Sequence, residues 1–206
     1  EIATTVNKNK LTTLNSGLAR TKAKISQIIA ECLRCKAKNE PVIIYTHYYG
    51  GGILECLLTR LRDAKLTVGT YTGRNPKTRE IQAKEFVDGK LDVLLGSQCL
   101  ATGIDDLQNV CSNMIINLLP MTNAEYRQLR GRIVREGQQK GVNIFIPVTK
   151  FVNGRHTMSE DLQDWKRLKR KGNIADAAVD GKFPSSGKRM KKFSATEGRI
   201  EISKML

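Results

Sequence analysis

The stretch at 128–135 reads Gln-Leu-Arg-Gly-Arg-Ile-Val-Arg, and it says more about the fold of this chain than any other. In an α-helix each residue turns the chain by about 100°, so Gln128, Arg132 and Arg135 would lie within an arc of roughly 60°. Arginine keeps its charge at any working pH, and its forked donors match phosphate oxygens. The spacing therefore predicts a helix with one phosphate-binding face. The alternative is a basic helix whose charges only face solvent. Its inward side would carry Tyr126, Leu129 and Ile133.

Short β-rich runs alternate with helical patterns around this stretch. A chain of alternating strands and helices predicts a parallel sheet covered by helices on both faces, with functional groups at the carboxyl ends of the strands. The expected strands are 42–45, 67–72, 93–95, 114–118 and 143–148. The expected helices are 20–38, a segment from the glycines 50–52 to about 63, 75–89, and the arginine stretch itself.

Four segments occur in the order typical of one family of motors. The stretch 128–135 resembles motif VI of superfamily-two helicases and translocases, and 92–105 resembles motif V. The segment 41–48 (PVIIYTHY) looks like motif IV, and Tyr-Thr-Gly at 71–73 looks like the short loop that touches a nucleic-acid backbone. The resemblance covers roughly 20–181 and is closest to the Swi/Snf-type branch. It implies a carboxy-terminal RecA-like lobe, an α/β fold with a helical and basic C-terminal extension.

The resemblance assigns the nucleotide chemistry to a few side chains. It implies that Arg132 and Arg135 reach the γ-phosphate of ATP as arginine fingers while Gln128 supports the cleft. Gly103 would let the backbone come close and Asp105 would bind the ribose, although a plain turn aspartate is the alternative. The cofactor would be ATP with Mg²⁺ in the complete protein. Neither a Walker A loop nor a Walker B Asp-Glu pair occurs in this sequence, so we expect an N-terminal RecA-like partner lobe to hold the metal, and no metal site in this chain.

The same resemblance implies contacts between strand ends and nucleic acid. Small hydroxyls and backbone amides bind phosphate without reading bases. The alternative at 46–47 is a strand end with a satisfied imidazole, and a lone serine at 97 is ambiguous. The expected contact residues are Thr46, His47, Thr72, Gly73, Ser97 and Thr102, with Lys188, Arg189, Lys191 and Lys192 in the tail.

Charge and composition point to a polyanionic partner. The 206 residues carry a net charge of +15, and the pI is near 9.8, which favours nucleic acid. Only 5% of the residues are aromatic, so backbone contact with double-stranded DNA and steep salt dependence are expected rather than base stacking. No apolar run approaches the roughly 20 residues of a membrane helix. The five cysteines look reduced, which predicts a cytoplasmic or nuclear protein, nucleoid-associated if prokaryotic.

These patterns divide the chain into four expected parts. Residues 1–19 would connect to an N-terminal part, 20–155 would form the RecA-like lobe, 156–181 a helical brace, and 182–206 a basic tail that is mobile unless bound. The predicted function is the C-terminal motor lobe of an ATP-dependent DNA translocase or helicase, inactive as an ATPase on its own. A non-catalytic basic nucleic-acid-binding module with the same fold, or the motor lobe of a restriction enzyme, is the alternative.

Overall fold

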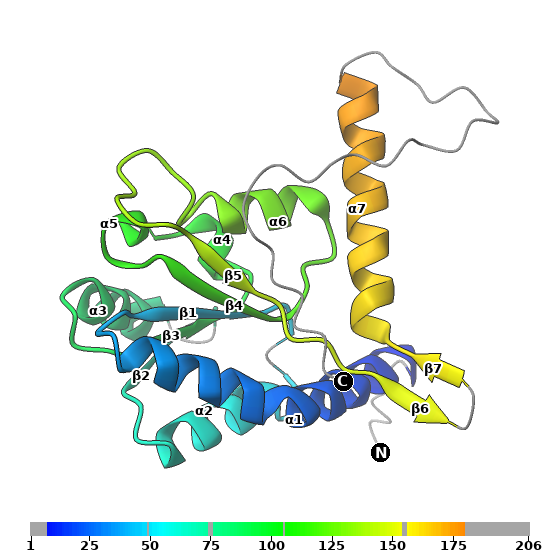
Figure 1. The fold of residues 1–206 in the computed structure, drawn as a ribbon, viewed down its shortest axis with the longest axis horizontal. Coiled ribbons are helices and arrows are strands. Elements are labelled where there is room, and N and C mark those ends of the chain that lie inside the picture. Colours follow the sequence, from blue (N-terminus) through cyan, green and yellow to red (C-terminus); the bar gives the residue numbers. More distant parts are fainter. Residues whose placement is uncertain (1–7, 49, 74–75, 105, 154–155, 180–206) are drawn as a thin grey trace, which may run out of the picture.

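A computed structural model describes residues 8–48, 50–73, 76–104, 106–153 and 156–179 (Figure 1). Its centre is a five-stranded sheet with the order β2-β3-β1-β4-β5. Every pairing in this sheet is parallel, which confirms the predicted RecA-like α/β architecture. The strands are β1 (Val42–Thr46), β2 (Val68–Tyr71), β3 (Val93–Gly96), β4 (Asn113–Leu118) and β5 (Asn143–Phe145).

The sheet is buried on both faces because its side chains alternate between two apolar cores. Ile43 and Tyr45 of β1 enter one core, whereas Val42 and Ile44 enter the other. Successive residues of a strand point to opposite faces, so a continuous apolar run suits a strand covered on both sides. All five residues of β1 are buried.

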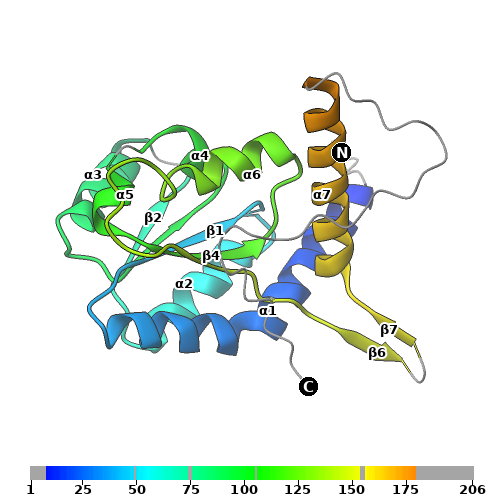
Figure 2. The same ribbon diagram turned by 45° about the horizontal axis from the view of Figure 1, so that its top comes forward.

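Two layers of helices cover these faces (Figures 1 and 2). One layer supplies the core that contains Val42, and the other supplies the core that contains Tyr45. The first layer consists of α1 (Lys8–Lys36) and α2 (Ile53–Asp63), and the second of α3 (Pro76–Val87), α4 (Cys99–Thr102), α5 (Leu107–Val110) and α6 (Asn123–Arg130).

Helix α1 begins at Lys8, so the prediction of a helix that starts at residue 20 was wrong, and α1 runs through the expected boundary at 19–20. The reason lies in how its first half packs. A Cβ on Gly17 would lie 3.1 Å from Ile53 and 3.3 Å from Leu118, so glycine lets α1 approach α2 and β4 closely. Arg20 docks on acidic partners in α7. Hydrophobic periodicity detects neither a glycine contact nor an ionic one.

After β5 the chain forms a small hairpin and a long helix. Strands β6 (Phe151–Asn153) and β7 (His156–Met158) pair antiparallel, and neither was predicted from the sequence. Helix α7 (Glu160–Val179) confirms the helix expected after Met158. It packs on α6 through Trp165, whose ring meets Tyr126 edge to face with centroids 5.6 Å apart.

The remaining expectations concern the tail and the membrane. Residues Lys188, Arg189, Lys191 and Lys192 lie outside the described residues. Within the described ranges, no helix is long and apolar enough to cross a lipid bilayer.

Candidate functional site

Helix α6 starts with a side-chain cap and stops before the two arginines. The hydroxyl of Thr122 accepts a hydrogen bond from the Glu125 amide at 3.2 Å. The helix ends at Arg130. Beyond it, the Arg132 amide donates to Leu129 O at 3.2 Å, a bond between residues three apart rather than four, as in the tighter turns that end many helices.

The prediction that one helical face carries Gln128, Arg132 and Arg135 was therefore wrong. Only Gln128 belongs to α6, and the two arginines follow in a series of turns. Turns tighter than an α-helix rotate the chain by more than 100° per residue, so the arc drawn from the sequence does not apply. The inward residues were predicted correctly, since Tyr126, Leu129 and Ile133 are buried.

Arg132 is held by the backbone of the segment that follows β3. Its Nε and Nη2 donate to the carbonyl of Ala101 at 3.1 and 2.7 Å, and its Nη1 donates to the carbonyl of Ile104 at 3.0 Å. The last carbonyls of a helix lack partners within it, and arginine side chains can supply them. Arg132 therefore fastens the turn after α6 to the end of α4.

Arg135 is exposed at the rim of an open hollow of about 540 Å³. The same hollow is lined by Asp106, Gln108, Glu136 and Gly137. Asp106 has a left-handed backbone, with φ of 64°. The hollow thus lies between the turn after α6 and the loop that connects α4 to α5. Arg135 is at the surface beside that loop.

Gly103 lies where a side chain would collide with its neighbour. A Cβ there would be 2.5 Å from the hydroxyl of Tyr71, and that hydroxyl donates to the Gly103 carbonyl at 3.0 Å. Burial raises the pKa of Tyr71, so it stays protonated as a donor. Glycine therefore allows the end of β2 and the loop after α4 to touch. Asp105, expected to bind the ribose, lies outside the described residues.

The residues expected to contact nucleic acid after β2 and β3 lie at neighbouring strand ends. Thr72 is buried and Gly73 is exposed. Ser97 is buried, and its amide donates to Tyr71 O at 3.2 Å. Thr102 belongs to α4. The parallel sheet brings these segments to one edge, and their contact with nucleic acid stays a prediction.

At the end of β1 the predicted contact residues have partners inside the chain. The hydroxyl of Thr46 donates to Tyr48 O at 3.0 Å. His47 is buried, with Nδ1 3.2 Å from the Tyr45 hydroxyl and 3.4 Å from Glu125 Oε1. These contacts agree with the alternative of a strand end with a satisfied imidazole.

Sequence reasoning missed the polar cluster that ties β1 to α6. The Tyr45 hydroxyl donates to Glu125 Oε1 at 2.6 Å, across 80 residues of sequence. Burial opposes ionisation, but the hydrogen bonds from His47 and Tyr45 outweigh it and lower the pKa of Glu125. This contact joins two elements that are distant in sequence. Neither hydrophobic periodicity nor a sequence motif predicts it, because both describe residues that are close together in the chain.

A second missed cluster joins α1 to α7. Arg20 Nη1 lies 3.3 Å from Asp161 and 2.8 Å from Asp164. Lys24 Nζ lies 3.1 Å from Asp161, whose other oxygen accepts from the Thr149 amide at 2.8 Å. Arg20, Lys24 and Asp161 are buried, so these bonds fix the start of α7 on the lobe.

Comparison with known proteins agrees with this arrangement. Residues 23–137 match the family described as the helicase conserved C-terminal domain. The chain therefore belongs to this family. Its parallel five-stranded sheet is the fold of this helicase C-terminal domain.

Two solved structures are similar to this chain. The C-terminal part of the Fun30 ATPase domain is 22% identical with a TM-score of 0.54, over 65% of this chain and 40% of that chain. The helicase domain of Pyrococcus furiosus Hef is 18% identical with a TM-score of 0.48, over 71% of this chain and 28% of that chain. This chain thus aligns with about two fifths of the Fun30 chain's length. A search of curated protein sequences gave no match.

Proposed function

We propose that this chain is the C-terminal motor lobe of an ATP-dependent DNA translocase or helicase, and that Arg135 is its arginine finger. The observation that carries the proposal is the bond between Arg132 and the Ala101 carbonyl. This bond fastens the turn bearing Arg135 to the loop after β3, and Arg135 is exposed beside it. Membership in the helicase C-terminal domain family supports the same assignment.

The hollow beside Arg135 suits the phosphate end of a nucleotide that a partner lobe also holds. A guanidinium matches phosphate oxygens, but Asp106 and Glu136 share the rim and would repel a phosphate bound to this lobe alone. ATP with Mg²⁺ would supply the γ-phosphoryl group and its counter-ion. Among the described residues, no group of three or more His, Cys, Asp or Glu side chains could hold a metal ion. We infer that the N-terminal lobe holds it.

The two arginines would then have different tasks. Arg135 would stabilise charge that develops on the phosphoryl oxygens, which is how such arginines accelerate hydrolysis. Arg132 would position it, because its donors already hold two carbonyls of the α4 segment. Gln128 is exposed on α6 and would face the cleft between the lobes.

Nucleic acid would bind along the strand ends. The sheet order places the ends of β2, β3 and β1 side by side, with Gly73 exposed among them. Backbone amides and small hydroxyls at these ends would hold phosphates without reading bases. We infer that double-stranded DNA is the partner and that its binding weakens steeply with salt, given the net charge of +15.

Measurements of ATP hydrolysis by the 206-residue chain and by the complete protein, each with and without duplex DNA, test this proposal. The chain alone should give background rates, because its sequence has no Walker A loop. The complete protein should hydrolyse ATP faster when DNA is present. Substantial turnover by the highly purified chain, or DNA-insensitive rates in the complete protein, would contradict the proposal.

A further inference from the structure

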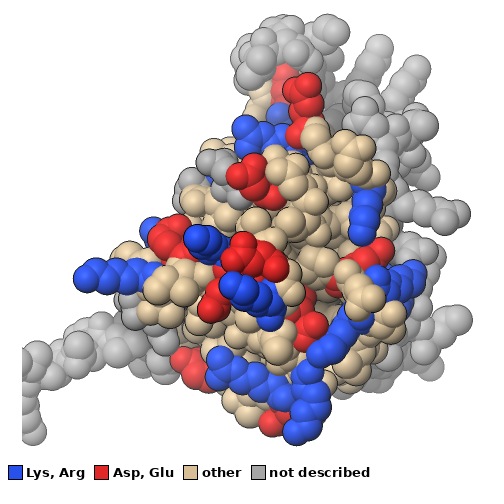
Figure 3. All heavy atoms as spheres, turned by 90° about the vertical axis from the view of Figure 1, so that its left-hand side faces the viewer, with Lys and Arg blue, Asp and Glu red and all other residues tan. Residues whose placement is uncertain are grey.

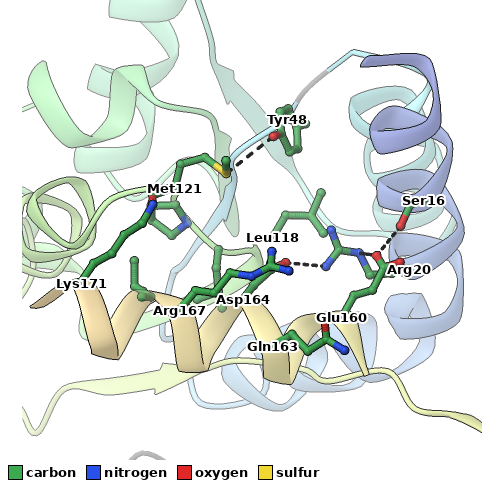
Figure 4. Close-up of a pocket in the computed structure, with 13 residues that line it drawn as sticks. Ser16, Arg20, Tyr48, Leu118, Met121, Glu160, Gln163, Asp164, Arg167 and Lys171 are labelled. Carbon is green, nitrogen blue, oxygen red and sulfur yellow. Dashed lines mark hydrogen bonds and ion pairs between the residues drawn. The ribbon is translucent and has the colours of Figure 1, made fainter. Parts of the chain in front are cut away.

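A pocket of about 480 Å³ lies between α1 and α7, beside the carboxyl ends of β1 and β4 (Figure 4). Tyr48, Leu118 and Met121 give it an apolar wall. Arg167 and Lys171 reach toward it from α7 and Arg20 from α1. Glu160 and Asp164 also line the pocket, but both lie against Arg20, at 3.4 and 2.8 Å. Arg167 and Lys171 give the rim a cationic side next to the apolar wall, which suits a sugar-phosphate backbone, in which charged and uncharged units alternate.

The pocket continues the row of strand ends. In the sheet order, β4 follows β2, β3 and β1. Lys171 Nζ donates to the Met121 carbonyl at 3.1 Å, so α7 borders the segment that leaves β4. A strand of nucleic acid that crosses the ends of β2, β3 and β1 would therefore arrive at α7.

The outer side of α7 is strongly basic. Five of the six residues at 166–171 are lysine or arginine, and all five are exposed, whereas Leu168 is buried. Lys166 and Arg170 lie one helical turn apart, as do Arg167 and Lys171, and like charges at this spacing destabilise a helix. Within the described part of the chain, Lys166 and Arg170 have no ion-pair partner. Packing of α7 explains only part of this run of charge: Lys169 lies over the Trp165 ring, and Arg167 and Lys171 have partners in Asp164 and the Met121 carbonyl.

Most ion pairs of the acidic residues of α7 are with residues outside its basic run, of which only Arg167 takes part. Asp161 binds Arg20 and Lys24, and Asp164 binds Arg20 at 2.8 Å and Arg167 at 3.1 Å. These carboxylates fix α7 to α1 and leave most of the basic run uncompensated. On the side of the molecule where α1 ends and β1 begins, basic and acidic side chains are interspersed (Figure 3).

We propose that this α7 surface, the pocket together with the basic run 166–171, binds the phosphate backbone of nucleic acid beyond the strand ends. The proposal rests on the proposed function, and it extends the binding path from β4 onto α7. Because each phosphate contact releases counterions, removal of one contact should lower the slope of log K against log salt by about 0.9.

The test measures binding of the 206-residue chain to a short labelled DNA duplex by fluorescence anisotropy over a series of salt concentrations. Two double variants remove charge from the α7 surface: Lys166→Gln with Arg170→Gln, and Arg167→Gln with Lys171→Gln. The matched control is Arg60→Gln with Arg62→Gln, which removes the same charge from exposed positions at the end of α2. Equal urea midpoints for all variants would verify that the fold is intact.

We expect each α7 double variant to bind several-fold more weakly and to lower the salt slope by about 1 to 2, with a clearly smaller effect of the control. Equal losses in the control and the α7 variants would overturn the proposal. The proposal would also be overturned if polyglutamate bound as tightly as DNA and the same variants lost that binding. The partner of this surface would then be an acidic protein.

A strand-end variant separates this proposal from the proposed function. Gly73→Glu places a negative charge at an exposed strand end and should repel phosphate there. If Gly73→Glu weakens binding while both α7 variants bind like the wild type, the α7 surface is not part of the path and the proposed function stands. If the wild-type chain binds no DNA at low salt, the proposed function itself fails.

Discussion

The guanidinium of Arg132 donates two hydrogen bonds to the carbonyl of Ala101, from Nε at 3.1 Å and from Nη2 at 2.7 Å. These two residues lie 31 positions apart in sequence. The bond links the turn after α6 to the end of α4, so Arg132 supports the architecture of the site. Arg135, three residues further on, is exposed. The two arginines of the motif should therefore differ in their effects on stability.

Arg132→Ala should destabilise the chain by about 1–3 kcal/mol, because two backbone carbonyls lose charged donors. Arg135→Ala should change the free energy of unfolding by no more than about 0.5 kcal/mol, as is usual for an exposed position. Urea denaturation of the 206-residue chain measures both. Equal destabilisation by the two substitutions would show that the Arg132 bonds do not hold the turn in solution.

Gly103→Ala should destabilise the chain because the added Cβ would lie 2.5 Å from the Tyr71 hydroxyl. Tyr71→Phe removes that oxygen, so Gly103→Ala should cost less in the Tyr71→Phe background. A double-mutant cycle measured by urea denaturation should give a coupling energy of roughly 0.5–3 kcal/mol. Simple additivity of the two substitutions would argue against the close approach.

Stability should depend on pH through Lys24. Burial lowers its pKa to about 8, although Asp161 opposes the shift. Between pH 8 and the ordinary lysine pKa of 10.5, the unfolded chain binds more protons at this position than the folded chain. The contribution of Lys24 to the free energy of unfolding should therefore rise with pH across that window.

Comparison with Lys24→Met isolates this contribution, because the other titrating groups are common to both proteins. The free energy of unfolding of the wild type relative to Lys24→Met should increase by on the order of 1–3 kcal/mol between pH 8 and 10.5. A difference that stays constant over this range would mean that Lys24 titrates normally in the folded chain.

The sheet could be read from the sequence because its signal is local. Val42, Ile43, Ile44 and Tyr45 form a continuous apolar run, and such runs suit strands buried on both faces. The buried side of α6 could also be predicted, since Tyr126 and Leu129 follow helical spacing. The strand signal is a run of apolar neighbours, and the helix signal is the spacing of apolar residues along one face.

The parts that sequence could not supply depend on contacts between distant segments. Arg132 lies in a tight turn and donates hydrogen bonds to carbonyls at the end of α4. The prediction from the sequence assumed that the helix continues through Arg132. The Tyr45–Glu125 bond joins residues 80 positions apart. The first half of α1 docks through Arg20 on acids of α7, a polar contact that leaves no hydrophobic period.

The catalytic rate constant of the complete protein carrying Arg135→Ala, measured beside Arg130→Ala, tests the central claim most directly. The Arg130 guanidinium lies 5.8 Å from the centre of the Tyr126 ring, on α6 itself, which makes it the matched control. Arg135→Ala should lower kcat for ATP hydrolysis by roughly 10³-fold or more while ATP and DNA binding persist, and Arg130→Ala should have a mild effect. Equal losses in the two variants, or a kcat unchanged by Arg135→Ala, would contradict the assignment of Arg135 as the arginine finger.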